Sequence, residues 1–211
     1  MNTFDWKAFL KQWSQEVIET VQEKTALPQQ VLEDEWLGYP AASENQILQA
    51  EAQLQRSLPP SYREFLMVTN GWRCPTPFIH RILPIESVTW FRVNHSHWIE
   101  EFVYRHLSRH QTNAAKNGSS ASLDALSDTA YFSYGDHQDC SKLRIQDLWT
   151  ALEISSKGDA SIYLLNPQVV TSGGEWEAWF FSDLLPGADR YRSFLEMMQA
   201  EHKNFLELRE L

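Results

Sequence analysis

The stretch LPPSYREFLMVTNGW, residues 58–72, decides the fold that the sequence predicts. Two prolines open it, and proline suits the first turn of a helix because its φ is already helical and its missing N–H is not needed there. A mostly apolar face follows at helical spacing, made by Tyr62, Phe65, Leu66 and Thr69. Asn70-Gly71 supplies residues that tolerate the left-handed conformation in which helices often end. The stretch therefore predicts a short, buried helix with sharp ends.

Two further helices are expected before this stretch. The first spans residues 4–24, and its apolar face consists of Trp6, Phe9, Leu10, Trp13, Val17 and Val21. The second begins at Ser43, because Ser43 and Gln46 have the spacing of a capping box, in which the two side chains satisfy free N–H groups of the first turn. Only a short link separates this helix from the helix of residues 58–72, so the two should form an αα-hairpin.

After Gly71 the sequence becomes rich in predicted strands. Short apolar runs predict strands at residues 81–85, 129–136, 151–156 and 160–167, and residues 168–185 predict a hairpin with Ser172-Gly173-Gly174 in its loop. Helical spacing returns at residues 97–110 and after Pro186-Gly187, and the polar stretch 111–128 predicts a loop. Helices first, a sheet next and a helix last, without strand–helix alternation, indicate an α+β fold with a mixed or antiparallel sheet flanked by helices.

Length and composition restrict the class of protein. A chain of 211 residues with 43% hydrophobic residues and nine tryptophans has enough apolar material for one well-packed domain. Cys74 and Cys140 form no CxxC pair, so reduced thiols are expected. The start MNTFDWKAFLKQW lacks the features of a signal peptide, and no apolar run is long enough to span a membrane. We therefore expect a cytoplasmic protein without a membrane partner.

The net charge of −10 bears on possible partners. The chain has no basic run, which argues against nucleic acid as a direct ligand. An acidic surface suits a basic protein partner, but it also serves as an ordinary means of keeping a protein soluble.

Three groups of side chains have residue types that could support chemistry. His95 with His97, and His106 with His110, have spacings that occur in zinc sites, but no further ligands complete a tetrahedral set. The segment YGDHQDC, residues 134–140, brings together Asp136, His137, Asp139 and Cys140, which could bind a metal or supply a Cys–His nucleophile. An acidic turn after a strand is the favoured interpretation. The P-loop, G-x-G-x-x-G and G-x-S-x-G motifs are absent, so we expect no enzyme, no metal and no cofactor.

Three blocks in order resemble the SMI1/KNR4 family, the SUKH superfamily. They are EWLGYPAASENQILQAEAQLQRSLPPSYREFLMVTNGW, ISSKGDASIYLLNP and GEWEAWFFSDLLPGADRYRSFLEMM. The resemblance implies an SMI1/KNR4-like domain at residues 27–211, with residues 1–26 as a helical extension. It also implies a binding protein rather than an enzyme. Many bacterial members resemble immunity proteins that neutralise toxins, several of them nucleases, whereas fungal members resemble regulators of cell-wall synthesis.

The expected contact residues are aromatic and acidic. Trp36 and Trp72 are either core residues, as large aromatics usually are, or anchors at the rim of a partner site. Asp136, Asp139, Glu175 and Glu177 could present negative charge to the basic active site of a toxin. The leading hypothesis is an immunity-type protein that binds a basic toxin domain. The alternative is a non-catalytic scaffold or regulatory protein of cell-wall or envelope synthesis.

Overall fold

The computed structural model describes residues 4–20, 27–76, 78–117, 128–158 and 160–209. Its helices are α1 (Trp6–Thr20), α2 (Gln29–Asp34), α3 (Glu44–Leu54), α4 (Pro60–Val68), α5 (Phe91–Asn117), α6 (Asp128–Tyr131) and α7 (Phe194–Arg209). Single turns of 3₁₀ helix occur at η2 (Ile85–Ser87), η3 (Gly135–His137) and η4 (Ile145–Trp149). The strands are β1 (Trp72–Thr76), β2 (Ile79–Ile82), β3 (Thr89–Trp90), β4 (Leu152–Glu153), β5 (Ser161–Val170), β6 (Trp176–Ser182) and β7 (Ala188–Tyr191). The α+β class is confirmed.

The centre of the fold is an antiparallel sheet with the strand order β3-β4-β5-β6-β7. The predicted hairpin is confirmed, since β5 and β6 pair along most of their length. β1 and β2 form a separate antiparallel ribbon, which an isolated bridge between Ile82 and Ser155 joins to the chain beyond β4. Sequence neighbours therefore pair throughout the second half of the chain, as expected for hairpin-rich antiparallel sheets.

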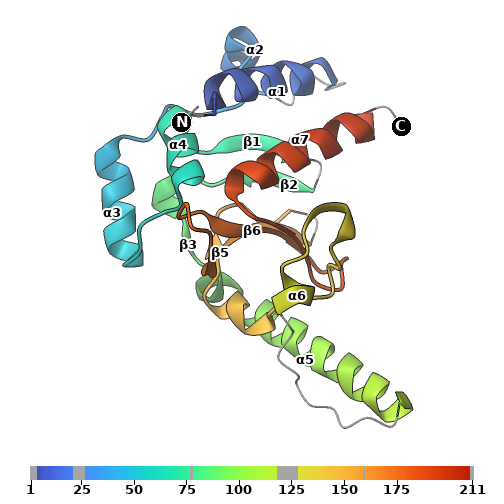
Figure 1. Ribbon diagram of the computed structural model, residues 1–211. Coiled ribbons are helices and arrows are strands. Elements are labelled where there is room, and N and C mark those ends of the chain that lie inside the picture. The colour runs from blue at the N-terminus through green and yellow to red at the C-terminus, as the bar shows by residue number, and fades with distance from the viewer. Residues whose placement is uncertain (1–3, 21–26, 77, 118–127, 159, 210–211) are drawn as a thin grey trace.

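Helices cover both faces of the central sheet, and β5 shows this most clearly (Figure 1). Tyr163 and Leu165 join a large core with α1, α3, α4 and α7. Ile162 and Leu164 point the other way, into a second core with α5, η4 and the far face of β6. Burial on both faces explains why this strand is an almost continuous apolar run instead of an alternating one.

Residues 58–72 form the predicted short, buried helix, but the helix ends at Val68 and its C-cap Thr69 is extended instead of left-handed. Pro60 occupies the first turn of α4, and Tyr62, Phe65 and Leu66 are fully buried. Asn70 accepts the Ile85 N–H through its side-chain oxygen at 2.7 Å, which fixes the turn after the helix. Gly71 has φ +103°, and a Cβ there would lie 2.9 Å from the carbonyl oxygen of Ile82. Only glycine fits such a close approach at this φ.

The N-terminal helix α1 is part of the main core. Trp6 contacts Phe65 of α4 and Phe194 of α7, with ring centroids 5.6 Å apart in both pairs. His202 of α7 forms a 2.5 Å hydrogen bond with Glu16, and Figure 1 shows α1 and α7 lying side by side. The capping box of Ser43 and Gln46 at α3 is also confirmed.

Several predicted strands are wrong or shorter than expected. Residues 129–136 form no strand: α6 ends at Tyr131 and η3 begins at Gly135, because side-chain contacts hold this segment instead of a strand ladder. β2 ends at Ile82, two residues before Pro84, which has no N–H for a ladder. The strand expected at residues 151–156 is reduced to β4. In the predicted loop 111–128, residues 111–117 continue α5, and residues 118–127 lie outside the described part of the chain.

Candidate protein-interaction surface

The six expected contact residues do not share one surface. Trp72 is 0% exposed, so the interpretation as a core residue is confirmed and the rim anchor is wrong for this side chain. Trp36 is half-buried, and its ring meets the ring of Trp72 edge-on, with centroids 5.3 Å apart. This pair joins the loop after α2 to the start of β1. It is a packing contact between two parts of the chain.

Glu175 is held by contacts within the fold. Its carboxylate accepts the Ser61 N–H at 2.9 Å and the Ser61 hydroxyl at 2.7 Å. Ser61 lies in the first turn of α4, where the N-terminal Pro59 provides no side-chain cap. A carboxylate at a helix start satisfies free N–H groups and interacts favourably with the helix dipole. Glu175 therefore caps α4 from the β5–β6 hairpin.

Glu177 is 1% exposed, so the expectation that it faces a partner is wrong. Its carboxylate lies 3.5 Å from a guanidinium nitrogen of Arg190, which is itself 0% exposed. Four neutral groups donate hydrogen bonds to the same carboxylate: the hydroxyls of Tyr131 and Tyr134, the indole of Trp179 and the amide of Asn166. A buried charge is tolerated when it is paired and hydrogen-bonded in this way.

The buried Glu177–Arg190 pair positions the segment that contains the remaining two residues. Arg190 donates from its guanidinium to the carbonyl of Tyr131, and its backbone N–H donates to the Gln138 side chain at 2.8 Å. The carbonyl of Cys140 accepts the N–H of Ala188, on β7, at 3.1 Å. Residues 135–141, here called the acidic segment, are thereby fixed along β7.

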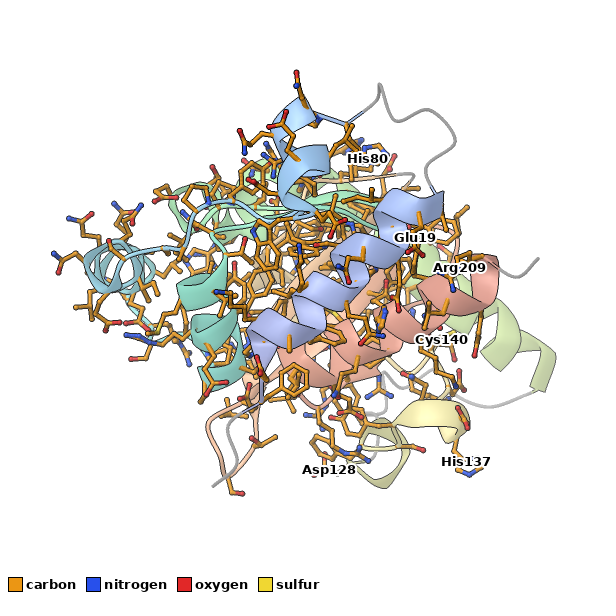
Figure 2. The ribbon with its side chains drawn as sticks, turned by 90° about the horizontal axis from the view of Figure 1, so that it is seen from above. Glu19, His80, Asp128, His137, Cys140 and Arg209 are labelled. Carbon is orange, nitrogen blue, oxygen red and sulfur yellow. The ribbon has the colours of Figure 1, made fainter. Side chains whose placement is uncertain are left out.

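The acidic segment exposes Asp136 and Asp139. Asp139 accepts hydrogen bonds from the backbone N–H and the hydroxyl of Ser141, at 2.9 and 2.6 Å. These bonds hold the pKa of the Asp139 carboxyl below its usual value, so it stays charged at neutral pH. Figure 2 shows His137 of this segment and Asp128 of α6 on the side of the molecule opposite His80. Sequence reasoning missed Arg190, the residue that holds the segment, because nothing local marks an arginine as buried.

The histidines and Cys140 were the candidates for other chemistry. His95 lies 3.4 Å from Glu153, and His97 lies 3.4 Å from Glu101. Burial raises the pKa of the Cys140 thiol, the opposite of what a nucleophilic thiolate needs. Across the described ranges, no three His, Cys, Asp or Glu side chains gather in a way that could hold a metal ion. The side chain of His110 lies outside the described part.

The fold is an α+β domain that carries an exposed acidic segment along β7. The sequence profile of the SMI1/KNR4 family (SUKH-1) matches residues 41–200, about three quarters of the chain. The chain therefore belongs to the SMI1/KNR4 family. A search of curated proteins found no significant match. α1 lies outside the matched range although it packs into the same core.

No helix in the described residues is both long and apolar enough to cross a membrane.

Proposed function

We propose that this protein is a cytoplasmic immunity-type protein that binds a basic bacterial toxin domain. The bound acidic segment keeps the toxin domain from its substrate. The protein acts by binding, without catalysis of its own. The observation that carries the proposal is the exposed pair Asp136 and Asp139, which a buried ion pair holds on a fixed segment of a SMI1/KNR4 domain. The resemblance of many bacterial family members to toxin-neutralising proteins supports it.

The charge of the chain suits such a partner. A net charge of −10 speeds the encounter with a basic protein and disfavours acidic competitors. The acidic segment is also pre-positioned, so little conformational entropy is lost when it is covered. We propose that Asp136 and Asp139 contribute contacts, and that half-buried Trp36 and Glu175 support the neighbouring structure. Residues 1–26 are proposed to be an extension that completes the core of the family domain.

The experiment is a growth assay with a basic toxin domain from the same host that this protein retains in a pull-down. Cells that produce the toxin should survive when the wild-type protein is co-expressed. The variant Asp136→Asn/Asp139→Asn should protect less, because two charges are lost while the hydrogen bonds to Ser141 are kept. Glu19→Gln/Glu33→Gln removes two exposed charges from α1 and α2 and should protect as the wild type does. Equal killing with and without the wild-type protein would contradict the proposed function.

A further inference from the structure

A hollow of about 230 Å³ lies where the end of α3, the start of α5 and the outer part of β5 meet. Leu54, Trp90 and Pro167 form its apolar part. Since one water occupies roughly 30 Å³ of liquid, the hollow has room for a side chain. It does not include any of the residues discussed above as partner contacts.

Two arginines, Arg56 and Arg92, line this hollow, and no acidic side chain lies among its lining residues. Within the described residues, neither guanidinium has a carboxylate within 4.0 Å. Arg63 and Arg144, by contrast, are paired with Glu44 and Asp128. Two unneutralised cations at one hollow are unexpected in a chain with a net charge of −10, where carboxylates are plentiful.

Two of the residues that line the hollow make hydrogen bonds to neighbouring groups. The exposed side chain of Arg92 donates one hydrogen bond to the carbonyl of Trp149, at 3.2 Å. The side-chain amide of Gln168 donates to the Thr150 hydroxyl at 3.1 Å on the same wall. The hollow therefore combines the positive charge of two exposed arginines with an apolar wall.

This combination selects a particular kind of anion. Guanidinium groups match the geometry of carboxylates, with two parallel hydrogen bonds. The overall negative charge of the chain repels free polyanions, whereas one carboxylate carried on a basic protein still approaches favourably. The apolar wall suits the methylene groups of an acidic side chain.

We propose that the hollow binds the carboxylate of an aspartate or glutamate side chain of the protein partner. This inference rests on the proposed function and extends it. The protein then recognises its partner through charges of both signs. The basic surface of the partner contacts the acidic segment, and one acidic side chain of the partner enters the hollow. Mixed contacts of this kind add specificity, since a partner without the carboxylate leaves two arginines unsatisfied.

The test is an NMR titration of the full chain with N-acetyl-glutamate methylamide, followed through the indole N–H signal of Trp90. That signal is assigned by its loss in Trp90→Phe. The glutamate compound should shift the signal saturably, and N-acetyl-glutamine methylamide should shift it at least tenfold less at equal concentration. Arg56→Gln/Arg92→Gln should weaken the binding at least tenfold. The matched control Arg81→Gln removes an exposed arginine of β2 and should bind as the wild type does.

Equal shifts with the glutamate and glutamine compounds would overturn the proposal, as would inorganic phosphate shifting the signal where glutamate does not. A dispersed amide spectrum of the double variant establishes that it is folded. The titration needs no toxin, so a negative result overturns the assignment of the hollow alone. A failed growth assay overturns the proposed function and leaves a positive titration standing.

Discussion

Glu177 on β6 and Arg190 on β7 form an ion pair at 3.5 Å with no appreciable exposure of either side chain. The pair lies under the acidic segment and connects the central sheet to it through Tyr131 and Gln138. The charged side chains of Glu177 and Arg190 therefore lie in the interior of the fold, where they contact neither a partner nor solvent. Their effect on function is indirect, since they fix the position of the exposed carboxylates.

Replacing Glu177 should destabilise the protein strongly. Glu177→Ala leaves Arg190 charged and buried without its carboxylate, and such a loss typically costs about 3–5 kcal/mol. Urea unfolding measures the change in the free energy of unfolding. The control Glu207→Ala breaks an ion pair whose side chains are 75% and 63% exposed, and it should change stability by less than about 1 kcal/mol. Equal effects of the two substitutions would show that the buried pair does not stabilise the fold.

The stability of the protein should depend on pH through Glu201. Burial raises the pKa of this carboxyl from its ordinary value of 4.5 to about 7, although hydrogen bonds from Tyr163 and Asn204 oppose the rise. The unfolded chain ionises Glu201 at the lower pKa, so its stabilising contribution is complete below about pH 4.5 and is lost as pH rises through about 7.

Glu201→Gln removes this ionisation and should flatten the pH dependence. Relative to the wild type, its free energy of unfolding should rise by about 3 kcal/mol between pH 4.5 and pH 8, from 1.36 kcal/mol per unit of pKa. Urea unfolding at the two pH values gives the difference. Glu207→Gln, at an exposed position of the same helix, should show no comparable change. A constant difference between Glu201→Gln and the wild type would contradict the burial of this carboxyl.

The capping box at α3 makes a smaller prediction. Ser43 accepts the N–H of Gln46, whose side chain reaches back to the N–H of Ser43. Ser43→Ala should lower the free energy of unfolding by about 1 kcal/mol. Ser57→Ala, in the exposed link after α3, should change it by less than about 0.5 kcal/mol. Thermal unfolding measures the stability of both variants. A Ser43→Ala variant as stable as the wild type would contradict a stabilising role for the cap.

The N-terminal helix should prove essential to the core. Trp13 of α1 is 0% exposed, and its ring lies 6.4 Å from the ring of Trp72. Trp13→Ala should cost about 3–5 kcal/mol in unfolding free energy because it opens a large cavity. Lys7→Ala, on the exposed side of the same helix, should cost far less. If Trp13→Ala and Lys7→Ala unfold at nearly the same urea concentration, α1 contributes little to the stability of the core.

Local signals explain which parts of the fold could be predicted. The prolines before α4, the capping box at α3, and Ser172-Gly173-Gly174 between β5 and β6 each act within a few residues, and each prediction is confirmed. The failure at residues 129–136 has the opposite cause. Arg190 holds that segment from about 59 positions away, and no local pattern records such a contact.

The contact residues were harder to predict than the fold. Side chains along residues 175–180 point alternately to the two faces of the strand, so Glu177 lies on the opposite face from Trp176 and Ala178. A glutamate on that face suggests that the face is exposed to solvent. α5 and η4 cover that face too, so Glu177 is buried as Trp176 and Ala178 are. Only Asp136 and Asp139 remain as exposed as the sequence suggested. Trp72 is buried because the ribbon of β1 and β2 packs against α1 and α7, an arrangement that sequence spacing does not reveal.

The most direct test of the account is a pull-down of the tagged protein from its own host, with mass spectrometry of the retained proteins. It is done in about 0.1 M and about 1 M salt, where the screening lengths are roughly 10 Å and 3 Å. The account predicts that a basic toxin domain is retained in low salt, is weakened in high salt, and is retained less by Asp136→Asn/Asp139→Asn. Retention of an envelope or signalling protein instead, insensitive to salt and to these substitutions, would contradict it and favour a scaffold.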